Sequence, residues 1–78
     1  MQNPKILQLS ALDYDYNDYE FKVSDIEYYY IIPAHELAER KIEFKTDVED
    51  DELVLVIIFK DGSYKGYSLA GHSMSFLY

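Results

Sequence analysis

The chain contains no cysteine, which excludes disulfides and thiolate metal sites. Small secreted domains usually depend on such cross-links, so we expect a reducing compartment, the cytoplasm, or the cytoplasm of the host cell if the chain is viral. The first residues lack the charged-then-apolar profile of a signal peptide. The longest wholly apolar run, at residues 53–59, is far shorter than the ~20 residues that span a bilayer. These absences predict a protein without a membrane partner.

Basic residues are scarce, with seven lysines and arginines against fifteen aspartates and glutamates, and a net charge of −8. Such a surface repels nucleic acid and anionic membranes and attracts basic surfaces. Direct binding to DNA or RNA is therefore the broad class that the composition argues against. The three glycines are scattered, so no phosphate-binding loop is predicted.

Seventy-eight residues predict a single domain over residues 1–78 with a thin hydrophobic core. The apolar content of 49% and the aromatic content of 17% exclude a disordered acidic tail, which would be poor in aromatic rings. We therefore expect the chain to fold despite its charge.

The strongest secondary-structure signal lies near the C-terminus. Residues 53–59 are rich in β-branched side chains and apolar on both faces, which is typical of a strand covered on both sides. Asp61 and Gly62 suit a two-residue type I′ turn, and residues 63–69 alternate as a returning strand. We predict a C-terminal β-hairpin that turns at residues 61–62. The second face of the apolar strand needs cover from the N-terminal segment or from a second copy, so monomer and homodimer both stay open.

The rest of the chain suggests shorter elements. Residues 26–32 predict a strand, and good helix formers with acids early and bases late predict a short helix at residues 33–41. Residues 19–23 and 42–45 alternate as strands, whereas residues 4–12 suit a capped helix or, with slight preference, a strand. The predicted fold class is α+β: a mostly antiparallel sheet of about five strands with one short helix on one face.

One acidic segment resembles a calcium-binding loop. Asp13, Asp15 and Asn17 match its first half, in which oxygens at alternate positions converge on the ion. The match then fails, because Asp18 stands where the loop needs glycine and Ser24 stands where it needs glutamate. A solvated acidic turn or strand explains these residues better.

Two other patterns resemble catalytic metal sites. Asp25 with Glu43 and Lys45 matches the carboxylates and lysine of metal-dependent nucleases. Residues 20–22 match the same short pattern, and the basic surface that a nuclease needs is missing. His35 begins a sequence similar to the zinc protease motif, but the second histidine of that motif is absent. We predict no catalytic residue, no metal and no cofactor, and hence no enzyme.

The acidic residues form two clusters, and the first interleaves with tyrosines. Tyrosine is enriched at binding hot spots, and carboxylates attract arginine and lysine. If residues 13–19 are extended, Asp13 and Asp15 lie about 6.7 Å apart on one face, since a strand advances ~3.3–3.4 Å per residue. That spacing is of the same order as the spacing of DNA phosphates. The residues predicted to bind a partner are Asp13, Tyr14, Asp15, Tyr16, Asp18, Tyr19, Glu20, Asp47, Glu49, Asp50, Asp51 and Glu52.

The size, acidity, tyrosine content and lack of cysteine resemble the small inhibitors that viruses and mobile elements make against nucleases, restriction enzymes and CRISPR effectors. Many of those inhibitors are DNA mimics. We therefore expect a non-enzymatic inhibitor of the DNA-mimic type, such as an anti-CRISPR or anti-restriction protein, that binds the basic nucleic-acid-binding surface of its target. The alternative is a tyrosine-mediated interaction module, an adaptor or an antitoxin-like partner, that does not compete with nucleic acid.

Overall fold

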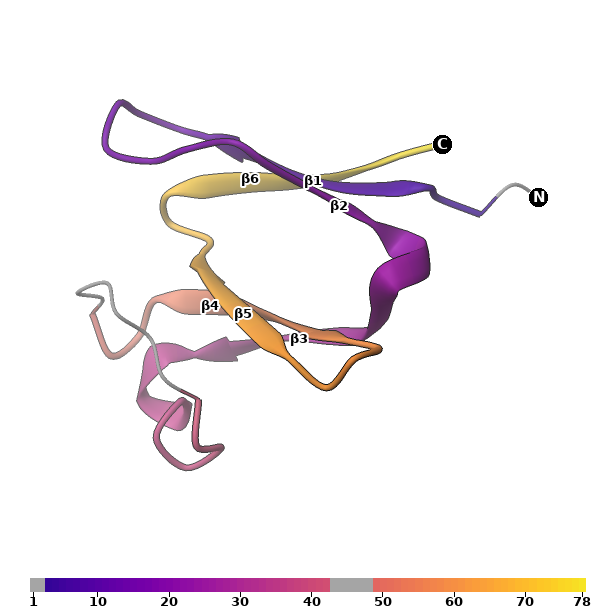
Figure 1. Ribbon diagram of the computed structural model, residues 1–78. Coiled ribbons are helices and arrows are strands. Elements are labelled where there is room, and N and C mark those ends of the chain that lie inside the picture. Colours follow the sequence, from indigo (N-terminus) through magenta and orange to yellow (C-terminus); the bar gives the residue numbers. More distant parts are fainter. Residues whose placement is uncertain (1–2, 43–48) are drawn as a thin grey trace.

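The computed structural model describes residues 3–42 and 49–78, which form six strands in two three-stranded antiparallel sheets (Figure 1). The first sheet has the order β2-β1-β6, and the second has the order β3-β4-β5. Two short 3-10 turns, η1 and η2, follow β2 and β3. The elements are β1 (Ile6–Ala11), β2 (Tyr19–Lys22), η1 (Val23–Asp25), β3 (Ile26–Pro33), η2 (Ala34–Glu36), β4 (Leu53–Phe59), β5 (Tyr64–Ser68) and β6 (His72–Leu77).

The two sheets pack face to face around the main core. Leu7 and Leu9 of β1 meet Leu55 and Ile57 of β4, and all four side chains are fully buried. Because side chains alternate along a strand, the positions between Leu7 and Leu9 and on either side of them point outward. Figure 1 shows the sheets one above the other, joined by η1 at one end and by the β5–β6 connection at the opposite end. These two ends are the places where loops gather.

A second, smaller core covers the outer face of the second sheet. Val54 and Val56 of β4 pack there with Ile32, and Leu37 and Ile42 from the segment after β3 lie over them. The strand β4 is therefore covered on both faces, as its doubly apolar sequence predicts. The first sheet supplies one cover and the segment after β3 supplies the other, within one chain.

The predicted C-terminal hairpin is confirmed, but the predicted type I′ turn is wrong. The Gly62 N–H donates to Phe59 O at 3.0 Å, and the Phe59 N–H donates to Ser63 O at 2.9 Å, so the loop has three residues. Gly62 has a positive φ of +90°. Asp61 does not have a positive φ, although a type I′ turn requires one at that position as well. Asp61 Oδ1 accepts from the Ser63 hydroxyl at 2.6 Å and from the Ser63 N–H at 2.8 Å, and these bonds lower the pKa of Asp61.

The predicted helix at residues 33–41, and with it the α+β class, is wrong. Only η2 and one further turn form, and Lys41 ends them at φ +59°, with the Ile42 N–H donating back to Leu37 O at 2.9 Å. So short a helix is marginal by itself, and this segment is used instead to cover the second sheet. No helix in the described residues is long and apolar enough to cross a membrane.

The remaining strand predictions are confirmed for the N-terminal half of the chain and incomplete for the rest. The ambiguous N-terminal segment is a strand, β1, and the strands expected at residues 19–23 and 26–32 form as β2 and β3. The sixth strand, β6, was not predicted. The strand expected at residues 42–45 lies outside the described residues, apart from Ile42.

Candidate functional site

The first acidic cluster forms the loop between β1 and β2, and two of its own carboxylates hold it in shape. Asp13 Oδ1 accepts from the Asp15 N–H at 2.9 Å, and Asp18 Oδ1 accepts from the Ala11 N–H at 2.7 Å. The Leu12 N–H adds a bond to Gly71 O at 3.1 Å, which fastens the loop to the β5–β6 connection. The loop is therefore acidic on its surface and hydrogen-bonded at its base.

The extended row of carboxylates does not form. Residues 12–16 are turns and bends, residues 17–18 are irregular, and none of them is strand. Aspartate favours such local turns because its side chain bonds the backbone two residues on, as Asp13 does here. The ~6.7 Å spacing expected for an extended segment therefore does not describe Asp13 and Asp15, and any likeness to DNA rests on the density of charge alone.

The three tyrosines of this segment occupy different environments. Tyr14 is fully exposed, at 105% of the reference area. Tyr16 packs with its ring against Gly71 and edge-on to His72, with 5.2 Å between ring centroids. Tyr19 belongs to the main core and lies 4.6 Å from the Tyr67 ring. Of the three, Tyr14 offers the most ring area to a partner.

The second acidic cluster lies beside η2. The Ala34 N–H donates to Glu52 O at 2.8 Å, and the His35 N–H donates to Asp50 O at 3.1 Å. The side chains of residues 49–51 are exposed, whereas Glu52 is partly buried. Asp47 lies outside the described residues.

Buried His72 and Ser68 connect the two clusters. His72 Nε2 lies 3.1 Å from Asn17 O in the first loop, and His72 Nδ1 lies 2.9 Å from Ser68 O. The Ser68 hydroxyl in turn donates to Glu52 Oε2 at 3.4 Å. This chain of hydrogen bonds links the two clusters at one end of the sandwich (Figure 1). A neutral imidazole donates to one carbonyl at a time, and an imidazolium donates to both.

We call this surface the acidic end. Within residues 3–42 and 49–78, no lysine or arginine forms an ion pair with its carboxylates. The ion pair in those ranges joins Arg40 to Glu36, at 4.0 Å. In the same ranges, no group of three histidine, aspartate or glutamate side chains is placed to hold a metal ion. The acidic end consists of Asp13, Asp15, Asp18, Glu49, Asp50, Asp51 and Glu52.

Glu20 is separate from this surface. Its side chain points outward from β2 and accepts from Gln8 Nε2 at 3.4 Å, and Gln8 Oε1 accepts from the Ser75 hydroxyl at 3.5 Å. These three residues form a polar row across the outer face of the first sheet. The structure thus brings seven of the predicted carboxylates together, without Glu20.

Sequence reasoning missed Gly71, His72 and Ser68, which support the acidic end. No local sequence pattern marks these residues as part of a site, because His72 follows a turn and Ser68 ends a strand. Their role arises from hydrogen bonds to residues 55 positions away for His72 and 16 positions away for Ser68. The alternation of residues 72–77, with serines at positions 73 and 75, was the signal that could have revealed β6.

Tyr67, beside His72, makes the stability of the fold sensitive to alkaline pH. Burial, and secondarily the neighbouring Tyr19, raise the pKa of Tyr67 from 10.0 to about 12. A raised folded-state pKa contributes stability that is complete below pH 10 and is lost as the pH rises through about 12. We expect Tyr67→Phe to make the fall in unfolding free energy between those pH values shallower, as measured by urea denaturation. Identical slopes for Tyr67→Phe and the parent would contradict this assignment.

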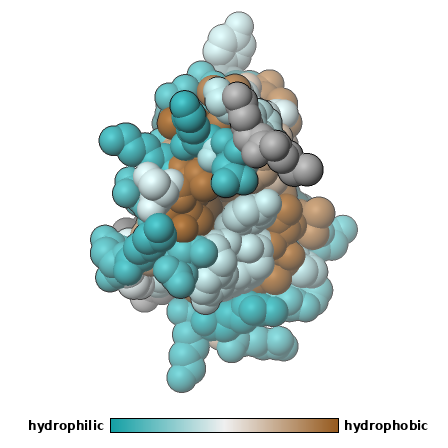
Figure 2. Space-filling view, turned by 90° about the vertical axis from the view of Figure 1, so that its right-hand side faces the viewer, coloured by the Kyte–Doolittle hydropathy of each residue, from teal (hydrophilic) through white to brown (hydrophobic). Residues whose placement is uncertain are grey.

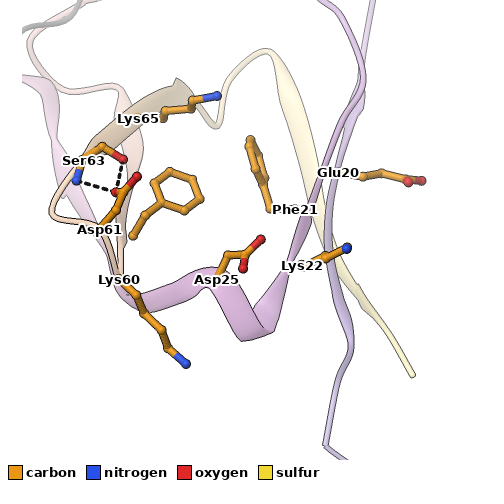
Figure 3. Close-up of a pocket in the computed structure, with 9 residues that line it drawn as sticks. Glu20, Phe21, Lys22, Asp25, Lys60, Asp61, Ser63 and Lys65 are labelled. Atoms are coloured by element: carbon orange, nitrogen blue, oxygen red, sulfur yellow. Dashed lines mark hydrogen bonds between the residues drawn. The ribbon is translucent and has the colours of Figure 1, made fainter.

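The opposite end of the sandwich carries both lysines and carboxylates. A hollow of about 650 Å³ lies there beside Phe21 and Phe59, whose rings are 5.7 Å apart. Figure 2, which faces this end, shows hydrophobic surface between hydrophilic side chains. Phe21 and Asp25 point into the hollow, whereas Lys22 and Lys60 point away from it (Figure 3). Because Glu20, Asp25 and Asp61 line it together with Lys22, Lys60 and Lys65, its mixed charges define no ligand class.

A third surface is aromatic. Tyr28, Ile58 and Tyr64 are register neighbours across β3, β4 and β5 on the outer face of the second sheet. Tyr28 is 55% exposed and Tyr64 is 38% exposed, and the Tyr28 ring stacks 6.2 Å from that of Tyr30. This row gathers partly exposed tyrosines of two strands on one face of a sheet, where a flat partner surface could contact them together.

Comparisons with protein-family models, with curated proteins and with solved structures find no match to this chain. What the protein does is therefore inferred from its own residues and geometry.

Proposed function

We propose that the acidic end binds the basic surface with which a nucleic-acid-processing protein holds its substrate, and that the protein is a non-enzymatic inhibitor of that partner. The observation that carries the proposal is the placement of both acidic clusters at one end, bridged by His72 and Ser68. A surface of this kind attracts arginine and lysine and steers their approach.

The hydrogen bonds beneath the acidic end support the proposal in a second way. Charges held in place before binding lose less conformational freedom when a partner arrives. Asp13 and Asp18 are so held, because each accepts a backbone N–H. Tyr14, exposed between Asp13 and Asp15, adds an aromatic side chain of the kind that is enriched at binding hot spots.

The partner class follows from charge. Nucleases, restriction enzymes and CRISPR effectors present basic clefts to phosphates, and carboxylates at an acidic surface compete for the same arginines and lysines. In this proposed role the protein acts in the cytoplasm, as a monomer or a homodimer. It uses no cofactor and does not bind nucleic acid itself.

The test is a triple substitution, Asp13→Asn, Asp15→Asn and Asp18→Asn, which changes the net charge from −8 to −5. Asparagine keeps the Oδ1 acceptors, so the loop retains its hydrogen bonds. Both proteins are immobilised and exposed to nuclease-treated bacterial lysate, and retained proteins are identified by mass spectrometry. We expect a basic nucleic-acid-binding protein that duplex DNA displaces, and about tenfold or greater loss of its retention by the variant.

The matched control removes three exposed carboxylates away from the acidic end: Asp25→Asn, Glu27→Gln and Asp61→Asn. It has the same net charge of −5, so equal loss of retention in both variants would show that overall charge, not the acidic end, binds the partner. Unchanged retention by the first variant would contradict the proposed function.

A second candidate function rests on the aromatic row. Tyr28, Ile58 and Tyr64 form a surface suited to a tyrosine-mediated adaptor or antitoxin-like interaction. A partner in the same capture that ignores DNA, survives the three Asp→Asn changes and is lost with Tyr28→Ala would favour this function over the first.

A further inference from the structure

A cavity of about 230 Å³ lies at the acidic end, between the edge strands β2 and β5. Sites for small molecules usually enclose ~300–1,000 Å³, so this cavity suits one side chain better than a whole metabolite. The residues that give it its chemistry are Asp15, Tyr16, Asn17, Tyr19, Tyr67 and His72.

Tyr16, Tyr19, Tyr67 and His72 bring aromatic rings to the cavity lining. The Tyr16 and Tyr67 rings lie 5.2 Å and 6.0 Å from the His72 ring, and the Tyr19 ring lies 4.6 Å from that of Tyr67. The face of an aromatic ring is electrically negative, so it attracts a cation that lies over it. Three tyrosines around one cavity are therefore a favourable environment for a positive group.

No lysine or arginine of the described chain supplies that positive group. The cation–π contacts formed elsewhere are those of Arg40 over Tyr30 and of Lys65 over Phe21 and Phe59. Asp15, which lines the cavity, is exposed and has no ion pair in the described ranges. The cavity thus combines aromatic rings and a carboxylate, and no cation of the described residues fills it.

We propose that this cavity binds the guanidinium group of a single arginine that the basic partner inserts. The proposal rests on the proposed function and names the group through which the partner is recognised. A guanidinium is planar and weakly hydrated, stacks on aromatic rings, and pairs with a carboxylate through two parallel hydrogen bonds. Tyr16, Tyr19 and Tyr67 provide the rings and Asp15 provides the carboxylate.

The test uses argininamide as the probe, added to the isotope-labelled protein and followed by NMR. We expect saturable shifts at Tyr16, Tyr67 and His72, with a dissociation constant on the order of millimolar, as a single side chain with few contacts allows. Citrullinamide, which has nearly the same shape without the charge, should cause no saturable shift. Lysinamide should bind more weakly, because an ammonium is strongly hydrated and does not stack.

Two exposed aspartates provide matched variants. Asp15→Asn should weaken argininamide about two- to fivefold, the range that one exposed charge pair contributes. Asp25→Asn removes an equal charge, but Asp25 lies at the opposite end of the sandwich and does not line the cavity, so binding should be unchanged. Both variants should melt at the parent temperature, which separates lost binding from lost structure.

Three results would overturn the guanidinium site: no saturable shift with argininamide, equal shifts with citrullinamide, or tighter binding of lysinamide. Equal weakening by Asp15→Asn and Asp25→Asn would also overturn it. If argininamide fails to bind while the triple Asp→Asn variant still loses its captured partner, this inference falls and the proposed function stands. If argininamide binds in the cavity but no basic partner is captured, the inference stands and the proposed function falls.

Discussion

Leu55→Ala is expected to lower the free energy of unfolding by about 2–5 kcal/mol, the range for removing a large aliphatic side chain from a packed core. Leu55 is fully buried between the sheets, against Leu7 and Leu9. A chain of 78 residues is stabilised by roughly 4–12 kcal/mol in total, at ~0.05–0.15 kcal/mol per residue. The substitution therefore removes a large part of the stability. Urea denaturation followed by circular dichroism measures the loss.

Leu53→Ala, two positions earlier in the same strand, is the control. Leu53 is 50% exposed, so truncating it leaves no enclosed cavity, and we expect a loss of less than about 1 kcal/mol. Similar losses for Leu53→Ala and Leu55→Ala would contradict the packing of β4 against the first sheet.

Gly71→Ala is expected to cost about 1–3 kcal/mol, the usual effect of inserting a methyl group where there is no room. Gly71 is buried, and the nearest atoms that an added Cβ would meet all belong to the Tyr16 ring. The ring would have to leave its place against His72, which loosens the first acidic loop. Thermal or urea denaturation measures the loss of stability, and NMR shifts at residues 13–18 report the change in the loop.

A double-mutant cycle separates this effect from a general intolerance of alanine at the position. Gly71 is not among the residues at positive φ, so its backbone conformation does not itself require glycine. In a Tyr16→Ala background the ring is absent, and Gly71→Ala should then cost less than about 0.5 kcal/mol. An undiminished cost in that background would show that Tyr16 is not what Gly71 accommodates.

Much of the sheet structure could be predicted from local pattern. Residues 53–59 are a strand with the predicted bounds, because a run of β-branched residues between turn signals has few other stable conformations. The helix at residues 33–41 could not be judged in the same way. Its propensities are real, but they are weak beside the gain from placing Leu37 and Ile42 over Val54 and Val56.

The candidate site was predictable in its chemistry and not in its shape. The clustered carboxylates of residues 13–20 and 47–52 can be read directly from the sequence, and the net charge of −8 is the basis for proposing a basic partner. The loop geometry was not visible, because Asp13 and Asp18 bond their own backbone neighbours instead of lying in a row. The burial of Tyr19 and the exposure of Tyr14 depend on how the two sheets pack, which local pattern did not determine.

By itself, the sequence determined the charge of this protein, its lack of cysteine, the strand β4 and the C-terminal hairpin, since these depend on composition or on neighbouring residues. Only the tertiary structure decided that the acidic residues at positions 13–18 and those at positions 49–52 share one end. It did so through His72 and Ser68, whose partners Asn17 and Glu52 lie far away in the chain. The physical reason is that buried polar groups must find hydrogen-bond partners, and those partners are chosen by the packing of the two sheets.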